Sequence, residues 1–198
     1  MSLRLSYTLL SPFYDTVVGP AFREARRASL AALPREGHCR VLVNGVGSGL
    51  DLPLLPSNHR YVGLDLTRAM LARSVRRAAG LEFAAVQGDS LALPFRDASF
   101  DYAVLHLILA VVPDAVRALA ETARVVRAGG AILVLDKFLR PGQHAPLRRL
   151  VNPVAARIAT RLDVVFEDAL AKVPGLRVTF NGPAAAGGWF RAIRLEKL

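Results

Sequence analysis

Cysteine is almost absent from this chain, which holds Cys39 alone among 198 residues. A single thiol excludes an internal disulfide and any metal site built from several cysteines. Neither structural metal nor oxidative cross-linking is therefore expected. This cysteine usage suits a reducing, cytoplasmic compartment.

Long apolar runs are also missing. Uncharged stretches such as residues 102–113 are well short of the ~20 apolar residues that cross a bilayer. No sustained apolar segment precedes Ser11-Pro12, so we expect no secretory signal. The length fits one domain. We expect a soluble protein, or one held peripherally at the inner face of the membrane.

Acidic residues are scarce only in the flanking segments. Residues 1–40 carry six basic against three acidic side chains, residues 41–136 nine against nine, and residues 137–198 eleven against four, for a net charge of +10. A basic excess confined to the flanks suggests an anionic partner or surface. The basic segments lack the interleaved aromatic residues that stack on bases, which disfavours a nucleic-acid partner.

A glycine-rich segment follows the first apolar run, which ends at Asn44. Gly45, Gly47 and Gly49 occupy alternate positions, and Asp65 ends the next apolar run 20 residues after Gly45. Glycines in such a turn bring the backbone close to a ligand, and a carboxylate at this spacing binds a ribose diol. The pattern predicts a nucleoside-containing cofactor.

The same glycines narrow the choice of cofactor. In the dinucleotide pattern Gly-x-Gly-x-x-Gly, the third glycine would stand where this chain has Leu50, so NAD is disfavoured. The Gly-Lys-Ser/Thr of a phosphate-binding loop is also absent. With Gly88-Asp89-Ser90 after a third apolar run, residues 40–137 resemble the class I S-adenosylmethionine-dependent methyltransferases.

The resemblance and the alternation of apolar strands with helices predict a single α/β, Rossmann-like domain. We expect a seven-stranded, mostly parallel sheet with an antiparallel terminal hairpin, helices on both faces and an extra N-terminal helix. Three parts are expected: an N-terminal helical cap (1–39), a cofactor-binding core (40–137), and an acceptor-side insertion with the hairpin (138–198). Expected strands are 40–44, 61–66, 81–87, 100–105, 131–137, 177–180 and 189–195, and expected helices are 22–33, 50–55, 67–79 and 114–127. Met70, Leu71 and Val75 should face inward.

The resemblance also implies roles for individual residues on the cofactor side. The glycines would approach the methionine part, Asp65 the ribose hydroxyls, and Asp89 the adenine amine. Family members usually carry Asp or Glu where Asn44 stands, and that carboxylate helps to hold the cofactor's ammonium group. The cofactor-binding residues implied are Asn44, Gly45, Gly47, Gly49, Asp65, Leu66, Asp89, Ser90, Leu91 and Leu105. The alternatives are a helix-start charge for Asp65 and a solvated loop carboxylate for Asp89.

On the acceptor side, methyl transfer needs a general base only when the nucleophile must lose a proton. His106 is the candidate to line the acceptor, or else an ordinary polar residue at a strand end. Tyr14 is a candidate lid over the cofactor, or else a core anchor. Asp136 and Lys137 could reach the site or pair with each other. Residues 137–161 carry six basic and no acidic side chains beside an apolar stripe, which fits either an anionic bilayer or a core-facing helix.

Four short segments resemble the bacterial phospholipid N-methyltransferases more specifically. The ubiquinone/menaquinone methyltransferases are similar over the core, but less so at these segments. The four segments are Tyr14-Asp15, Gly19-Pro20, residues 46–53 and residues 110–114. This resemblance implies phosphatidylethanolamine as acceptor, with basic side chains near lipid phosphates: Arg23, Arg26, Arg27, Lys137, Arg148 and Arg149. Asp136-Lys137-Phe138 departs from the usual Asn-His-Phe. Alternatives are a quinone or other small-molecule methyltransferase, a non-catalytic cofactor-binding homologue, and a nucleic-acid methyltransferase.

Overall fold

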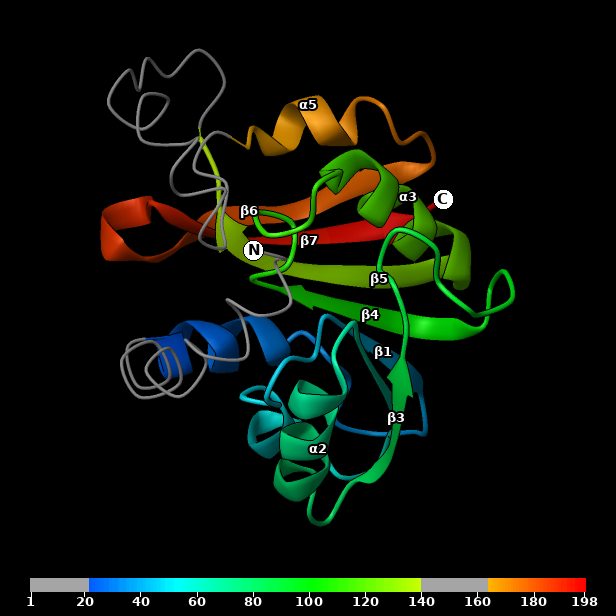
Figure 1. Cartoon of the computed structure of the whole chain (residues 1–198). Helices are drawn as coiled ribbons and strands as arrows, with labels where there is room; N and C mark the ends of the chain where they lie inside the picture. The colour runs from blue at the N-terminus through cyan, green and yellow to red at the C-terminus, as the bar shows by residue number, and fades with distance from the viewer. Residues whose placement is uncertain (1–21, 140–163) are drawn as a thin grey trace, which may run out of the picture.

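A computed structural model describes residues 22–139 and 164–198 of the chain. One sheet of seven strands runs through it in the order β3-β2-β1-β4-β5-β7-β6 (Figure 1). Strands β1 to β5 pair in parallel, and β7 lies antiparallel between β5 and β6. The predicted sheet and its antiparallel terminal pair are confirmed.

The elements follow the predicted alternation. A helix over residues 22–30 comes first. The strands are β1 Arg40–Asn44, β2 Arg60–Asp65, β3 Glu82–Gln87, β4 Phe100–His106, β5 Val126–Lys137, β6 Leu176–Ala185 and β7 Phe190–Lys197. The helices are η1 Leu52–Leu54, α2 Arg68–Arg77, α3 Ala115–Val125, α5 Phe166–Leu170 and η2 Ala186–Gly188.

Apolar side chains alternate between the two faces of the sheet, as the two-residue period of a strand requires. Leu42 of β1 packs in a core cluster with residues of α3 and α5, whereas Val41 and Val43 pack in a second cluster with Leu30 and Leu71. Accordingly α3 and α5 cover one face, and α2 and the helix over residues 22–30 cover the other (Figure 1). Helices on both faces are thus confirmed.

Two local predictions were wrong. Val75 is 55% exposed, and Ser74 takes the inward position on α2. A Cβ built on Gly49 would lie 2.8 Å from the Ser74 Cα, so the glycine loop packs where only a small residue fits. Helix α3 ends at Val125, and β5 begins five residues earlier than predicted, because Val126 pairs with Phe100 across a bulge in the β4–β5 register.

Candidate functional site

The strand order reverses between β1 and β4, which are neighbours although β2 and β3 separate them in the chain. In open α/β sheets, ligands bind beyond the carboxyl ends of the strands at such a switch point. Asn44 ends β1 and His106 ends β4, so the glycine loop and residues 107–112 start side by side. The site is therefore built from this edge of the sheet.

The three glycines of the loop serve different purposes, although each has a positive φ (74°, 54° and 86°). A Cβ on Gly45 would lie 2.7 Å from the Ile108 side chain, and one on Gly49 would strike Ser74 of α2. Around Gly47, by contrast, the nearest atom of the described residues lies 4.0 Å from such a Cβ. Gly47 therefore leaves backbone open to a ligand, and the other two permit close packing.

Asp65 joins this loop to the start of α2. One carboxylate oxygen accepts from the Gly47 N–H at 3.0 Å, and the other accepts from the backbone N–H and hydroxyl of Thr67 at 2.9 and 3.1 Å. Burial raises the pKa of Asp65, although these hydrogen bonds act in the opposite direction. Next to it, the Leu66 side chain is 43% exposed and gives an apolar surface beside the carboxylate.

Asn44 is buried, and both ends of its amide are hydrogen-bonded inside the protein. Its Nδ2 donates to Thr122 Oγ1 at 3.0 Å, and its Oδ1 accepts from the Ser90 hydroxyl at 2.6 Å. The Thr122 hydroxyl itself donates to the Ala118 carbonyl, so its partner must be a donor. An amide can donate to this oxygen, whereas a carboxylate could not, and Asn44 and Ser90 are joined to each other at the end of β1.

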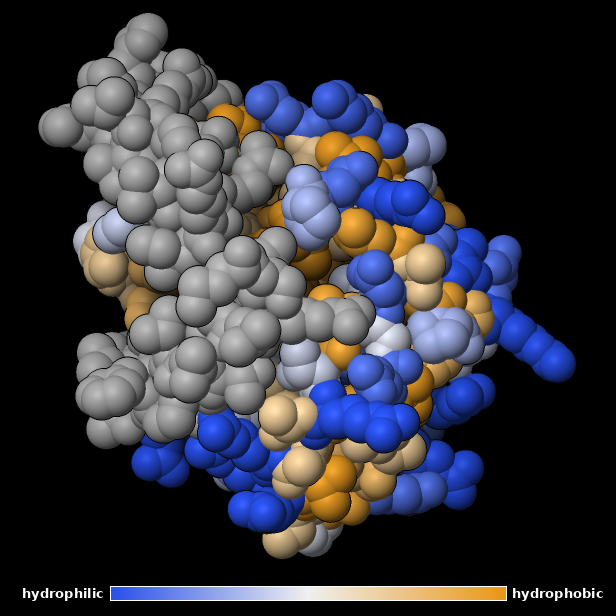
Figure 2. All heavy atoms as spheres, viewed as in Figure 1, coloured by the Kyte–Doolittle hydropathy of each residue, from blue (hydrophilic) through white to orange (hydrophobic). Residues whose placement is uncertain are grey.

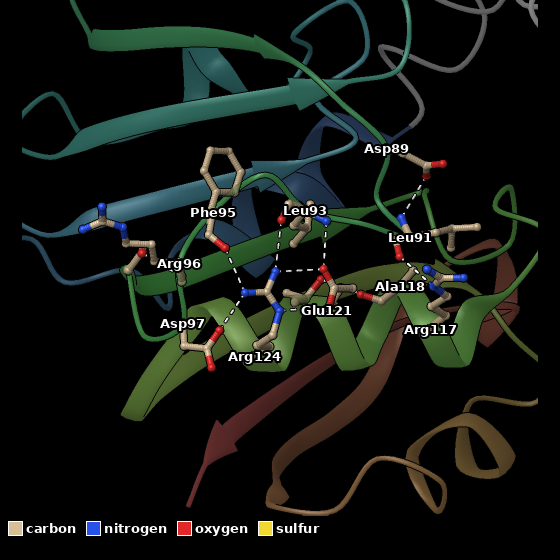
Figure 3. A network of polar contacts seen from close by, with 12 residues as sticks. Asp89, Leu91, Leu93, Phe95, Arg96, Asp97, Arg117, Ala118, Glu121 and Arg124 are labelled. Atoms are coloured by element: carbon tan, nitrogen blue, oxygen red, sulfur yellow. Dashed lines mark hydrogen bonds and ion pairs between the residues drawn. The ribbon is translucent and has the colours of Figure 1, made fainter.

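Asp89 lies on the exposed loop after β3, where its carboxylate accepts from the Leu91 N–H at 2.9 Å. Leu91 is half-buried and its carbonyl accepts from Arg117 of α3. Figure 3 shows how the following segment is attached to the same helix. Arg124 donates to the carbonyls of Leu93 and Phe95, and contacts Glu121 and Asp97 as well. Helix α3 thus fixes the segment that carries Asp89.

His106 is buried, and both of its ring nitrogens have partners. Nδ1 lies 2.7 Å from a carboxylate oxygen of Asp51, and Nε2 lies 3.0 Å from the hydroxyl of Ser29. The same Asp51 oxygen lies 2.8 Å from Nη1 of Arg26. Local sequence reasoning missed Asp51, Ser29 and Thr122 because each meets its partner only through tertiary contact.

Asp136 shapes the loop on the acceptor side of β4. It is buried, and its carboxylate accepts from the Ala110 N–H at 3.0 Å and the Lys137 N–H at 2.8 Å. Burial raises the pKa of Asp136 to about 6 and lowers that of the half-buried Lys137 amine. Asp136 therefore holds backbone in place, and its carboxylate contacts the Lys137 amide.

The basic residues predicted to meet lipid divide into two groups. Arg23 and Arg27 are exposed on the helix over residues 22–30, whereas Arg26 is buried against Asp51. Surface placement of Arg26 was therefore wrong, since its guanidinium compensates an internal carboxylate. Leu105, the residue before His106 in β4, is fully buried in the core cluster that includes residues of α3. Tyr14, Arg148, Arg149 and the amphipathic stretch of residues 140–161 lie outside the described residues.

The geometry suits a nucleoside cofactor: open backbone at Gly47, a carboxylate at Asp65 and an apolar surface at Leu66. A family model described as a methyltransferase domain matches residues 42–134. The chain is 32% identical over 191 residues to a phosphatidylethanolamine N-methyltransferase of Cereibacter sphaeroides, covering 93% of this chain and 92% of that protein.

Two further similarities agree. A demethylmenaquinone methyltransferase of Roseiflexus castenholzii is 36% identical over 164 residues, covering 76% of this chain and 68% of its own. The crystal structure of an S-adenosylmethionine-dependent methyltransferase from Thermotoga maritima superposes with a TM-score of 0.70 at 21% identity, covering 98% and 99% of the two chains. The chain therefore belongs to the class I S-adenosylmethionine-dependent methyltransferases.

Proposed function

We propose that this methyltransferase methylates the amine of a phosphatidylethanolamine-type phospholipid at the cytoplasmic surface of an anionic membrane. The observation that carries the proposal is the similarity to a phosphatidylethanolamine N-methyltransferase over nearly the whole of both chains. The quinone methyltransferase matches less of each chain. Methylation of a quinone or another small molecule is the second candidate, favoured by that relative's higher identity over the shared part.

S-adenosylmethionine, the cofactor of this enzyme, supplies a methyl group on a sulfonium centre. We assign the Gly47 backbone to the methionine part, Asp65 to the ribose hydroxyls, and Asp89 with Leu66 to the adenine. A carboxylate that accepts from two hydroxyls makes charge-assisted bonds, roughly twice as strong as neutral ones. The hydrogen bond between Asn44 and Ser90 joins the end of β1, where the glycine loop starts, to the loop after β3 that carries Asp89.

Charge supports the membrane part of the proposal. The chain carries +10, and Arg23 and Arg27 are exposed on the helix over residues 22–30. Near an anionic leaflet, each such residue contributes about 1 kcal/mol. Trp189 is 37% exposed and its ring lies tilted beside that of Phe190, which makes an edge contact with Phe22 of the same helix. An amphipathic aromatic beside basic residues suits a headgroup region.

The hydropathy of the described surface also agrees with membrane binding through charge. Hydrophilic residues separate smaller apolar areas over the coloured part of the face in Figure 2. No helix among the described residues is long and apolar enough to cross a bilayer. Binding to lipid would accordingly weaken as salt screens the arginines.

Radiolabelled methyl transfer tests the acceptor. The enzyme is incubated with labelled S-adenosylmethionine and vesicles of phosphatidylethanolamine with phosphatidylglycerol, and the lipids are separated by chromatography. We expect label in mono- or dimethylated phosphatidylethanolamine. Vesicles of phosphatidylglycerol alone, and the same vesicles with a demethylated quinone, are the other two arms. Label in the quinone and none in phospholipid would refute the proposal in favour of the second candidate.

A further inference from the structure

A buried polar cluster connects three separate segments at the carboxyl ends of β1 and β4. Asp51, just after the glycine loop, contacts His106 at the end of β4 and Arg26 of the helix over residues 22–30. The side chains of these three residues are 6%, 1% and 7% exposed. Ser29, one helical turn beyond Arg26, completes the cluster through its contact with His106.

The contacts define which ring nitrogen carries the proton. Burial alone would raise the pKa of Asp51, but His106 and Arg26 together hold it well below its ordinary range. Asp51 is therefore an ionised carboxylate and can only accept, so His106 Nδ1 carries a hydrogen. In the neutral ring Nε2 is then an acceptor, and the Ser29 hydroxyl donates to it.

Ion pairing does not by itself explain this arrangement. Arg26 already supplies a positive charge to Asp51, so a buried carboxylate would be compensated without the histidine. Among the residues that the structure describes, the buried Nε of Arg26 has no hydrogen-bond partner. The Arg26 guanidinium therefore does not use all of its donors. In this it differs from the bidentate arginine–carboxylate pairs, which contribute most to stability. What the cluster does define is a hydroxyl directed at a basic nitrogen that is supported by a carboxylate.

We propose that Ser29 and His106 accept the proton of an amine acceptor, and that Asp51 is the positioning residue that fixes the His106 tautomer. The inference rests on the proposed amine methylation. An ammonium acceptor must lose a proton before its nitrogen can attack a methyl group. The hydroxyl of Ser29 lies at the edge of the sheet where the family binds its cofactor, through its contact with the last residue of β4.

The atoms and charges balance as follows. The acceptor's N–H proton moves to Ser29 Oγ while the serine's own proton moves to His106 Nε2, leaving a neutral amine and an imidazolium. Asp51 stabilises that imidazolium through Nδ1–H. The amine lone pair forms the N–CH₃ bond as the S–CH₃ bond breaks, and the sulfonium becomes a neutral thioether. His106 afterwards returns its proton through Ser29 to solvent.

Other charged groups near the ring are accounted for. From the helix over residues 22–30, Arg26 faces Asp51. From the neighbouring strand β5, Asp136 is engaged with the Ala110 amide. Asp51 is therefore the carboxylate that contacts the ring directly.

Steady-state kinetics with phosphatidylethanolamine vesicles across pH 6 to 10 test the proposal. For Asp51→Asn we expect kcat to fall at least about tenfold, with the Kd for S-adenosylmethionine within about twofold of wild type. The pH–rate profile of this variant should differ from that of wild type, because the proposed base loses its carboxylate partner. Ser29→Ala should lower kcat without moving the Kd.

The matched control is Glu167→Gln, which removes a carboxylate paired with the largely buried Arg191. It should keep the wild-type rate and profile. If Asp51→Asn leaves Arg26 unpaired and the protein fails to fold, the double variant Arg26→Met/Asp51→Asn removes both charges. Nitrogen NMR of His106 then reports the tautomer independently of activity, and we expect the Nδ1–H form to lose its dominance in this variant.

The failures are distinguishable. A wild-type enzyme that leaves phosphatidylethanolamine unmethylated overturns the proposed function and, with it, this inference. An active wild-type enzyme whose Asp51→Asn variant matches Glu167→Gln in rate and pH profile overturns the inference alone. The same conclusion follows if the double variant regains the wild-type kcat.

Discussion

Replacing Asn44 with aspartate tests which way the residue at the end of β1 faces. The family resemblance links a carboxylate here to the cofactor's ammonium group, so Asn44→Asp would tighten binding on that interpretation. In the structure both ends of the amide are engaged, with Thr122 and with Ser90. We expect the substitution to destabilise the fold and to change the affinity for S-adenosylmethionine less than about twofold.

The magnitude follows from the surroundings. The side chain is buried, with Asn44 1% exposed, and its two partners are neutral. The Thr122 hydroxyl donates to the Ala118 carbonyl, so its oxygen needs a donor from residue 44. In Asn44→Asp, a carboxylate oxygen would take the place of the Nδ2 donor and face the Thr122 oxygen without a hydrogen bond. Losing that bond costs about 1 kcal/mol, and an unpaired buried charge costs about 2 kcal/mol more. Together about 3 kcal/mol lowers Tm by about 6–12 °C for a chain of this size.

Thermal and urea unfolding at pH 5 and pH 7, with calorimetric titration of S-adenosylmethionine, measure both effects. Burial raises the pKa of the introduced carboxyl, so the folded state holds its proton to higher pH and the loss of stability is larger at pH 7. Thr122→Val is the control, because it removes the same acceptor without adding charge and should cost about 1 kcal/mol. A variant as stable as wild type that binds the cofactor tenfold more tightly would refute the reasoning.

Three other substitutions test the surrounding site. Asp65→Asn removes the charge assigned to the ribose and sets a donor against the Gly47 N–H, so calorimetry should find binding weakened at least about tenfold; unchanged affinity would place the ribose elsewhere. Asp136, with a pKa of about 6, holds its proton in the folded state where the unfolded chain has lost it. Its contribution to stability should fall by about 3 kcal/mol between about pH 4 and pH 7, and Asp136→Asn should flatten that slope in urea titrations; a wild-type slope would contradict the assignment. Arg124→Met should lower stability by about 2 kcal/mol and speed hydrogen exchange over residues 91–97, where Arg124 donates to the carbonyls of Leu93 and Phe95; unchanged protection would mean that α3 does not fix this segment.

The first strand and the glycine turn could be predicted because their determinants are local. The strand at residues 40–44 has the predicted bounds, and the turn at Gly45 follows directly from the chain. The inward face of α2 could not be predicted in full. Its apolar pattern offered Val75, but the packing of Gly49 against Ser74 decides which face is covered. Contact with a loop 25 residues earlier in the chain overrides the hydrophobicity of a single position.

The polar cluster around His106 depends on contacts between distant residues. His106 meets Asp51 across 55 positions and Ser29 across 77, distances at which one sequence gives no pairing signal. One signal for Arg26 was nevertheless present. Phe22, Arg26, Ser29 and Leu33 recur at four, three and four residues, the spacing of one helix face, and Ser29 and Leu33 are buried. Arg26 therefore belonged to the inner face, and its charge implied a buried acid.

The glycine loop joins the two halves of the proposed reaction. At Gly47 its N–H is held by Asp65, the residue assigned to the ribose, and four residues later Asp51 holds His106. Between them Gly49 fixes the loop against α2, where a larger residue would meet the Ser74 backbone. A displacement of this short segment would move the cofactor contact and the proton acceptor together. Asp51 also forms an ion pair with Arg26, so the helix over residues 22–30 is attached to the same segment. This helix, which carries the exposed Arg23 and Arg27, is therefore held in a fixed position relative to the proposed reacting groups.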